Sequence, residues 1–169
     1  LCAVLALYPL DALLMGGELG VRHRFSTISL VAPLYLLAMM SYLRLQSTRF
    51  RLLRAALLGY MPIAALAPWL PGDWFVSFPS NQPYASFNHY LYGLETGAWV
   101  MKGFSYLLIA TAATLVLQRL SSSRFSSSVL LALALVPLAS VAVDFAASLT
   151  GFSPYHGVTT VQIAVTIGL

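Results

Sequence analysis

Long apolar runs are the feature that most constrains this chain. Residues 27–43, 55–70, 97–117 and 128–149 are almost wholly apolar, and a helix needs about 20 such residues to cross a bilayer. Partial runs occupy residues 1–15 and 158–169. Only 8% of the residues are charged, against about 25% in an average soluble domain. We therefore predict an all-α, polytopic transmembrane bundle with six visible spans.

The two ends of the chain lie inside apolar runs. It begins at Leu1 and ends at Leu169 without a polar flank on either side. We expect residues 1–169 to be one transmembrane domain, cut from a longer polypeptide at both ends. Prolines occur in four of the predicted spans, at Pro9, Pro33, Pro62 and Pro137, and each is expected to bend its helix because it lacks a backbone N–H.

The charges between the spans predict an orientation. Six arginines lie in the predicted loops 44–54 and 119–128, whereas the predicted loop 71–96 contains no Lys or Arg. Basic residues accumulate in cytoplasmic loops. We therefore expect loops 44–54 and 119–128 in the cytoplasm, and loops 16–26, 71–96 and 150–157 outside.

Composition also excludes several chemistries. The formal net charge is +4, but the basic residues lie in gaps between apolar runs, so the bilayer and not nucleic acid is the expected partner. The single cysteine, Cys2, cannot form an internal disulfide, and no Cys/His cluster has metal-ligand spacing. We find no catalytic constellation either, and expect no catalytic residue, metal or cofactor.

Four short motifs, in order, resemble a known family. They are LVAPLYLL at 30–37, RAALLGYMP at 54–62, FSYLL at 104–108 and GFSP at 151–154. The chain is similar to the N-terminal seven-transmembrane sensor region of bacterial histidine kinases, which also occurs ahead of diguanylate cyclases. One departure is Thr159, which stands near the place where the family often has Asp.

The resemblance implies a sensor of the bacterial inner membrane with six of seven spans present. It implies that a histidine kinase or diguanylate cyclase domain follows Leu169 in the cytoplasm and that the parent protein forms a homodimer. The segment itself would bind an unidentified small ligand and relay the signal in two-component signal transduction.

Three charged residues within the predicted spans are the first site candidates. Asp11, Lys102 and Asp144 would each lie roughly 7 to 9 Å below the outer boundary, at about 1.5 Å per residue. One hypothesis is a buried polar cluster under an outward-facing cavity, since intramembrane charges usually face a bundle interior. The alternative is that Lys102 snorkels to the headgroups while the acids stay close to water.

External aromatic and histidine residues are the second set of candidates. One interpretation is an aromatic belt at the membrane interface, and the other is a lid that contacts an apolar or amphipathic ligand. The histidines could also sense pH or bind a ligand. The candidates are Trp74, Tyr84, His89, Tyr92, Tyr155 and His156.

Two functions remain open at this point. A sensory domain is the leading hypothesis, and a fragment of a transporter or channel with an Asp/Lys pathway is the alternative. A retinal protein is disfavoured because Lys102, the only lysine, lies in the fourth predicted span and not in the last one.

The polar-cluster hypothesis makes a mutational prediction. Lys102→Met should impair folding or signalling because it would leave buried carboxylates without a counter-charge, and the further change Asp144→Asn should partly restore it. Thermal stability in detergent measures the effect. Full stability and activity of the single variant would exclude the cluster.

Overall fold

Four long helices make up most of the structure, a computed structural model that describes residues 17–77, 93–120 and 127–150. The elements in chain order are α2 (Gly17–Tyr42), α3 (Thr48–Leu66), the 3-10 turn η1 (Ala67–Trp69), β1 (Val76–Ser77), β2 (Gly93–Leu94), α4 (Thr96–Leu120) and α5 (Ser127–Thr150). The predicted helical bundle is confirmed here, apart from the two short strands. The predicted spans 1–15 and 158–169, with Pro9, lie outside the described residues.

Three of the helical segments are long and apolar enough to cross a membrane. They are Phe25–Tyr42, Thr48–Trp69 and Thr96–Arg119. Helix α5 contains a shorter apolar stretch, Ser128–Val143. At 26 residues, α2 is about 39 Å long, more than the hydrocarbon thickness of about 30 Å.

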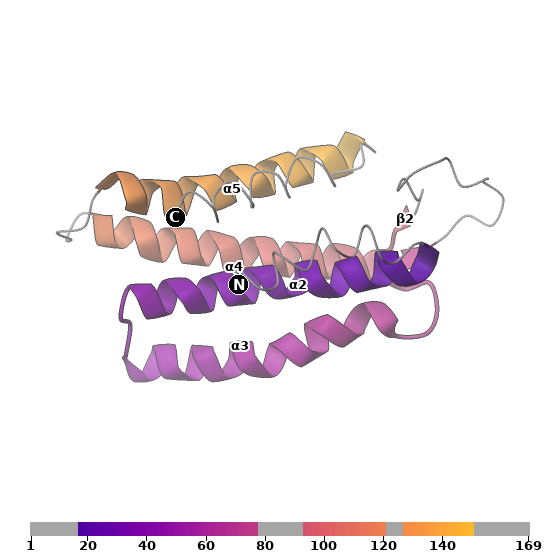
Figure 1. Cartoon of the computed structure of the whole chain (residues 1–169), viewed down its shortest axis with the longest axis horizontal. Helices are drawn as coiled ribbons and strands as arrows, with labels where there is room; N and C mark the ends of the chain where they lie inside the picture. The colour runs from indigo at the N-terminus through magenta and orange to yellow at the C-terminus, as the bar shows by residue number, and fades with distance from the viewer. Residues whose placement is uncertain (1–16, 78–92, 121–126, 151–169) are drawn as a thin grey trace.

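The helices lie side by side in the spatial order α3, α2, α4, α5 (Figure 1). Helix α2 packs against both α3 and α4, and α5 packs against α4. The turn between α2 and α3 lies at the same end of the bundle as the end of α4 and the start of α5 (Figure 1). We call this the arginine end, because Arg44, Arg49, Arg51, Arg54 and Arg119 lie at or near it.

The hydrophobic core follows the second half of α2. Residues of α2 pack against small and apolar residues of α4, and Leu57 of α3 and the first half of α5 complete the cluster. Ala112 and Ala113 are almost fully buried, and small side chains of this kind let two helices approach closely in a membrane. The core residues in and just after α2 are Ala32, Tyr35, Leu36, Met39, Met40 and Leu43.

The outer surfaces of the helices are apolar as well. Large apolar side chains are exposed along α3, α4 and α5, which would favour aggregation in water but suits lipid. They include Leu52, Leu58, Ile63 and Leu66 of α3, Val100, Leu107 and Leu117 of α4, and Val129, Leu131, Leu135, Val143 and Phe145 of α5. The structure is therefore compatible with a membrane protein.

Hydroxyl groups inside the helices bond to their own backbone. The hydroxyls of Ser29, Thr111, Thr114 and Ser140 each donate to the carbonyl four residues earlier, with oxygen–oxygen distances of 2.7 to 3.0 Å. This bond satisfies a polar group without water. It explains how these residues are accommodated within apolar helices.

Helices α2 and α3 are joined at both ends by arginines. Arg22 of α2 donates to the carbonyls of Pro68, at 2.6 Å, and Leu70, at 3.3 Å, just beyond the end of α3. Arg54 of α3 donates to the carbonyls of Met40 and Leu45 at the end of α2, both at 3.2 Å. Carbonyls at a helix C-terminus lack intrahelical donors and attract positive charge. We call these two contacts the arginine clamps.

The clamps explain two errors in the predicted loops. Residues 16–26 were expected to be a loop, but helix α2 already begins at Gly17. Residues 44–54 were also expected to be a loop, but α3 begins at Thr48. The charged residues of these segments had indicated loops, yet Arg22 and Arg54 lie within helices because each is satisfied by the neighbouring helix.

The turn between α2 and α3 has the geometry of a Schellman motif. Leu45 N–H donates to the Met40 carbonyl and Arg44 N–H to the Ser41 carbonyl, both at 3.0 Å. Arg44 has φ = 51°, the left-handed conformation that ends many helices and that usually falls to glycine. The half-buried Leu45 packs against the core beside it.

A tyrosine links α2 to the proline of α5. Pro137 lies inside α5 and has no N–H to donate to the Leu133 carbonyl four residues earlier. The hydroxyl of the buried Tyr35 donates to this same carbonyl. The third helix of the core, α4, lies between α2 and α5 (Figure 1), so this bond reaches past it.

The clamps predict different roles for two neighbouring arginines. Arg54→Met should lower the free energy of unfolding by about 1 to 2 kcal/mol, because two carbonyls lose a charged donor. The matched control is Arg51→Met, since Arg51 is exposed and its guanidinium bonds Thr48 of its own helix, at 3.4 Å. We expect the control to change stability by less than about 0.5 kcal/mol. Thermal unfolding in detergent checks this, and equal losses would contradict it.

Candidate functional site

The end of the bundle opposite the arginine end is rich in exposed aromatic residues. All three tryptophans of the chain lie there: Trp69 in η1, Trp74 before β1 and Trp99 in the first turn of α4. Their side chains are 41%, 42% and 37% exposed. Amphipathic indole rings prefer the membrane–water interface, so we call this the tryptophan end and expect it at one boundary of the bilayer.

The segment around Trp74 is anchored to two helices. Phe75 is 1% exposed, and its ring packs edge-on against Phe25 of α2, with centroids 5.4 Å apart. Its carbonyl accepts the Glu95 N–H at 3.2 Å, and the following residues pair antiparallel, with Val76 opposite Leu94. These contacts hold both ends of the predicted loop 71–96 in a defined position.

Trp74 lies directly against the start of α4. Its carbonyl accepts the Gly97 N–H at 2.9 Å. A Cβ atom added to Gly97 would lie 2.3 Å from Cε3 of the Trp74 ring and 2.9 Å from the Trp74 carbonyl oxygen. No side chain fits between the two, so this contact requires glycine at position 97.

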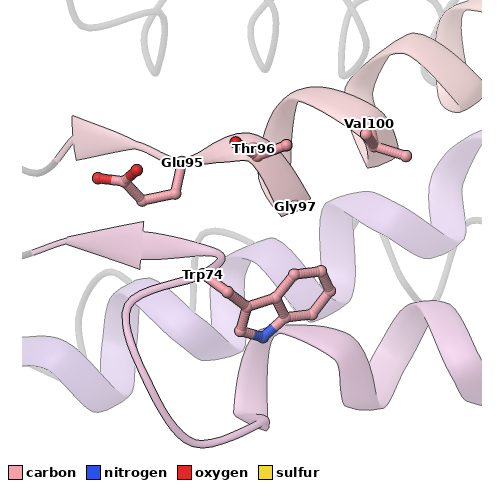
Figure 2. Close-up of a pocket in the computed structure, with 5 residues that line it drawn as sticks. All are labelled: Trp74, Glu95, Thr96, Gly97 and Val100. Carbon is pink, nitrogen blue, oxygen red and sulfur yellow. The ribbon is translucent and has the colours of Figure 1, made fainter.

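A shallow cavity of about 280 Å³ opens at this contact. Its lining residues are Trp74, Glu95, Thr96, Gly97 and Val100. Figure 2 shows the indole of Trp74 beneath the first turn of α4, with Glu95 toward one side and Val100 toward the other. Within the described part of the chain, no hydrogen bond or ion pair engages the half-buried Glu95 carboxylate.

The side chains that line the cavity determine what it can bind. An indole, a valine and one carboxylate can contact an apolar group with a polar or cationic end. No group of three His, Cys, Asp or Glu residues within ranges 17–77, 93–120 and 127–150 could hold a metal ion. The sequence predicts a role for Trp74 but not for Glu95, Gly97 or Val100. These three residues come close to Trp74 only when β1 and β2 pair.

Lys102 is the one member of the proposed polar cluster whose side chain is described. Its Nζ lies 5.6 Å from the centroid of the Trp99 ring, one helical turn closer to the tryptophan end, and this cation–π contact is favourable. Asp144 lies in the last two turns of the neighbouring α5, at the same end of the bundle, and Asp11 lies outside the described residues. The cluster and the snorkelling interpretation therefore both stay predictions.

The remaining external candidates fall outside the described ranges. They are Tyr84, His89, Tyr92, Tyr155 and His156. Their proposed role as a lid or as an aromatic belt stays a prediction.

Comparisons of the chain with protein-family models, curated proteins and solved structures find no match. The resemblance to sensor regions therefore depends on the four short motifs alone.

The contact between Gly97 and Trp74 makes a testable prediction. Gly97→Ala should destabilise the protein by about 1 to 3 kcal/mol, because the methyl group overlaps the ring and the backbone oxygen. Gly103→Ala is the matched control in the same helix, since a Cβ there meets nothing within 4 Å. The control should be neutral or stabilising by up to about 1 kcal/mol, because alanine favours helix. Thermal unfolding and tryptophan fluorescence check both variants, and a stable Gly97→Ala protein with an unchanged spectrum would contradict the close contact.

Proposed function

We propose that this chain is the membrane-embedded sensory module of a larger bacterial signalling protein. In this proposal a small ligand binds at the tryptophan end, and a cytoplasmic catalytic domain beyond the arginine end receives the signal. The observation that carries it is the contrast between the two ends of one packed bundle. One end has a cavity lined by Trp74 and Glu95, and the other has arginine-rich turns.

The order of the motifs adds support. LVAPLYLL lies in α2, the central helix, RAALLGYMP in α3 and FSYLL in α4. The prolines of the first two motifs, Pro33 and Pro62, are both inside helices. This is the arrangement that resemblance to the sensor regions implies, with homodimer formation and kinase or cyclase activity belonging to the parent protein.

The proposed orientation follows from the positive-inside rule. The arginine end would face the cytoplasm, and the tryptophan end would face outward. Arg22 and Arg24 are the exceptions at the tryptophan end, and the guanidinium of Arg22 is engaged by the carbonyls of Pro68 and Leu70. A guanidinium that already bonds these carbonyls is a weaker anchor for anionic lipid. Arg22 therefore counts less in the positive-inside rule.

Labelling of single cysteines tests this orientation. In a Cys2→Ser background, Asp73→Cys reports the tryptophan end and Gln46→Cys the arginine end, and both positions are exposed. A membrane-impermeant maleimide should label position 73 in intact bacterial cells and position 46 only after lysis. The opposite pattern would reverse the orientation and place any domain that follows a sixth span outside the cell.

A transporter or channel fragment is the alternative, based on Lys102 and Asp144 within helices. The buried polar residues of the described ranges favour the sensor. They are Ser26, Thr27, Ser29 and Ser140. Thr27, Ser29 and Ser140 each donate to a carbonyl of their own helix, and Ser26 donates to the Ala65 carbonyl of α3 and accepts the Trp69 indole N–H. A hydroxyl that is satisfied within its own helix is not aligned for an ion pathway, which needs polar groups that face one another or water.

The coding sequence on either side of this segment decides between the two functions. The sensor proposal expects an in-frame phosphoacceptor helix with an ATP-binding domain, or a cyclase domain, after residue 169. Further membrane spans that repeat this bundle in inverted topology would instead support a transporter. Ion or solute flux in liposomes made with the purified full-length protein tests that alternative directly.

A further inference from the structure

The bond between Tyr35 and α5 lies beside the proline that interrupts that helix. Because Pro137 has no N–H, the Leu133 carbonyl lacks its helical donor, and such groups are costly to leave unsatisfied in a membrane. The Tyr35 hydroxyl donates to it from α2. Tyr35 is 7% exposed, so its own hydroxyl also needs a buried partner.

The two halves of α5 on either side of Pro137 are packed differently. Before the proline, Leu130, Leu133 and Ala134 belong to the hydrophobic core and are at most 4% exposed. After the proline, Ser140 is buried, but the side chains of Ala142, Val143, Phe145 and Ala146 are exposed. Leu138 and Val141 of the second half pack against this core from its edge. Among the described side chains, the first half of α5 is therefore the more deeply buried of the two.

A second feature weakens the helix beside the proline. The Ser140 hydroxyl donates to the Val136 carbonyl at 3.0 Å, a back-bond that often bends helices. Beyond it, the ring of Phe145 approaches Tyr106 of α4 edge-on, with centroids 6.4 Å apart. This ring contact and the packing of Leu138 and Val141 against the core are among the contacts that attach the half of α5 leading to the tryptophan end.

We propose that Pro137 is a hinge in α5 and that the Tyr35 hydroxyl is the latch that holds it in one arrangement. In the latched arrangement Tyr35 satisfies the Leu133 carbonyl. In the released arrangement this bond is broken and the second half of α5, which carries Asp144, moves relative to α4. A ligand at the tryptophan end that binds the two arrangements with different affinity shifts their populations. The signalling meaning of the hinge rests on the proposed function.

Distances between spin labels in nanodiscs test the hinge. In a Cys2→Ser background, one label goes on α3 by Leu52→Cys. The other goes on α5, beyond the hinge by Val143→Cys or before it by Val129→Cys, and all three positions are exposed. Tyr35→Phe removes only the hydroxyl. It should shift or broaden the 52–143 distance distribution and leave the 52–129 distribution unchanged.

Two further variants keep the test specific. Pro137→Ala restores an N–H for the Leu133 carbonyl, so adding Tyr35→Phe to it should leave the 52–143 distance unchanged. Tyr60→Phe is the matched control, since the Tyr60 hydroxyl contacts Met101 Sδ at 3.5 Å and no proline-freed carbonyl. It should leave both distances unchanged.

Three results would overturn the latch. The first is an unchanged 52–143 distance in a folded Tyr35→Phe protein. The second is an equal change in the 52–143 and 52–129 distances. The third is a change in the 52–143 distance when Tyr60→Phe is made alone, or when Tyr35→Phe is added to Pro137→Ala. These measurements need no downstream domain. If α5 proves rigid, the hinge is excluded and the sensor proposal is unaffected. If the parent protein has no signalling domain, the sensor proposal is excluded and the hinge is unaffected.

Discussion

A backbone carbonyl without a helical donor is costly wherever water is scarce, and the described helices meet this cost with side chains from their neighbours. Arg22 and Arg54 bond the carbonyls at the C-terminal ends of α3 and α2. Ser26 donates to the Ala65 carbonyl at 2.7 Å in the last turn of α3. Tyr35 donates to the carbonyl that Pro137 frees in α5. Each of these bonds links two helices, so satisfying the backbone also determines how the helices pack.

Helix α2 takes part in every one of these bonds, and this explains its central place. It supplies three donors, from Arg22, Ser26 and Tyr35, and receives one from Arg54. Ser26 also accepts the Trp69 indole N–H at 2.7 Å, which places a tryptophan of the interface relative to the bundle axis. Because α2 has α3 on one side and α4 on the other, it supplies many of the buried residues of the core, while each of its neighbours also has exposed apolar residues. Its position follows from both polar and apolar contacts.

Hydropathy was sufficient to locate the middle of each described helix but not its ends. Four predicted spans coincide with α2, α3, α4 and α5. The errors are at the starts of α2 and α3, where charged residues were interpreted as loops. Hydropathy counts a guanidinium as unfavourable in a membrane helix. It contains no information on a second helix whose carbonyls come next to that guanidinium only in the folded chain. Arg22 and Arg54 are therefore correctly assigned only once the antiparallel pairing of α2 and α3 is known.

The residues of the candidate cavity differ in the same way: one could be predicted from the local sequence, and the others only from tertiary contacts. Trp74 could be selected from the sequence because an aromatic residue in a loop between spans indicates an interface. Glu95 and Gly97 carry no such local signal. Their role depends on the pairing of Val76 with Leu94, which brings residue 74 against residue 97.

Prolines illustrate why similar sequence signals can have different consequences. Pro62 and Pro137 both interrupt an apolar helix, and the sequence predicts a bend at each. Pro62 lies on an exposed face of α3, whereas the carbonyl freed by Pro137 faces a buried tyrosine of α2. A proline near lipid changes the course of one helix, but a proline whose free carbonyl bonds to another helix couples the two. For this reason α5 is the helix through which movement at the tryptophan end can be transmitted to the centre of the bundle.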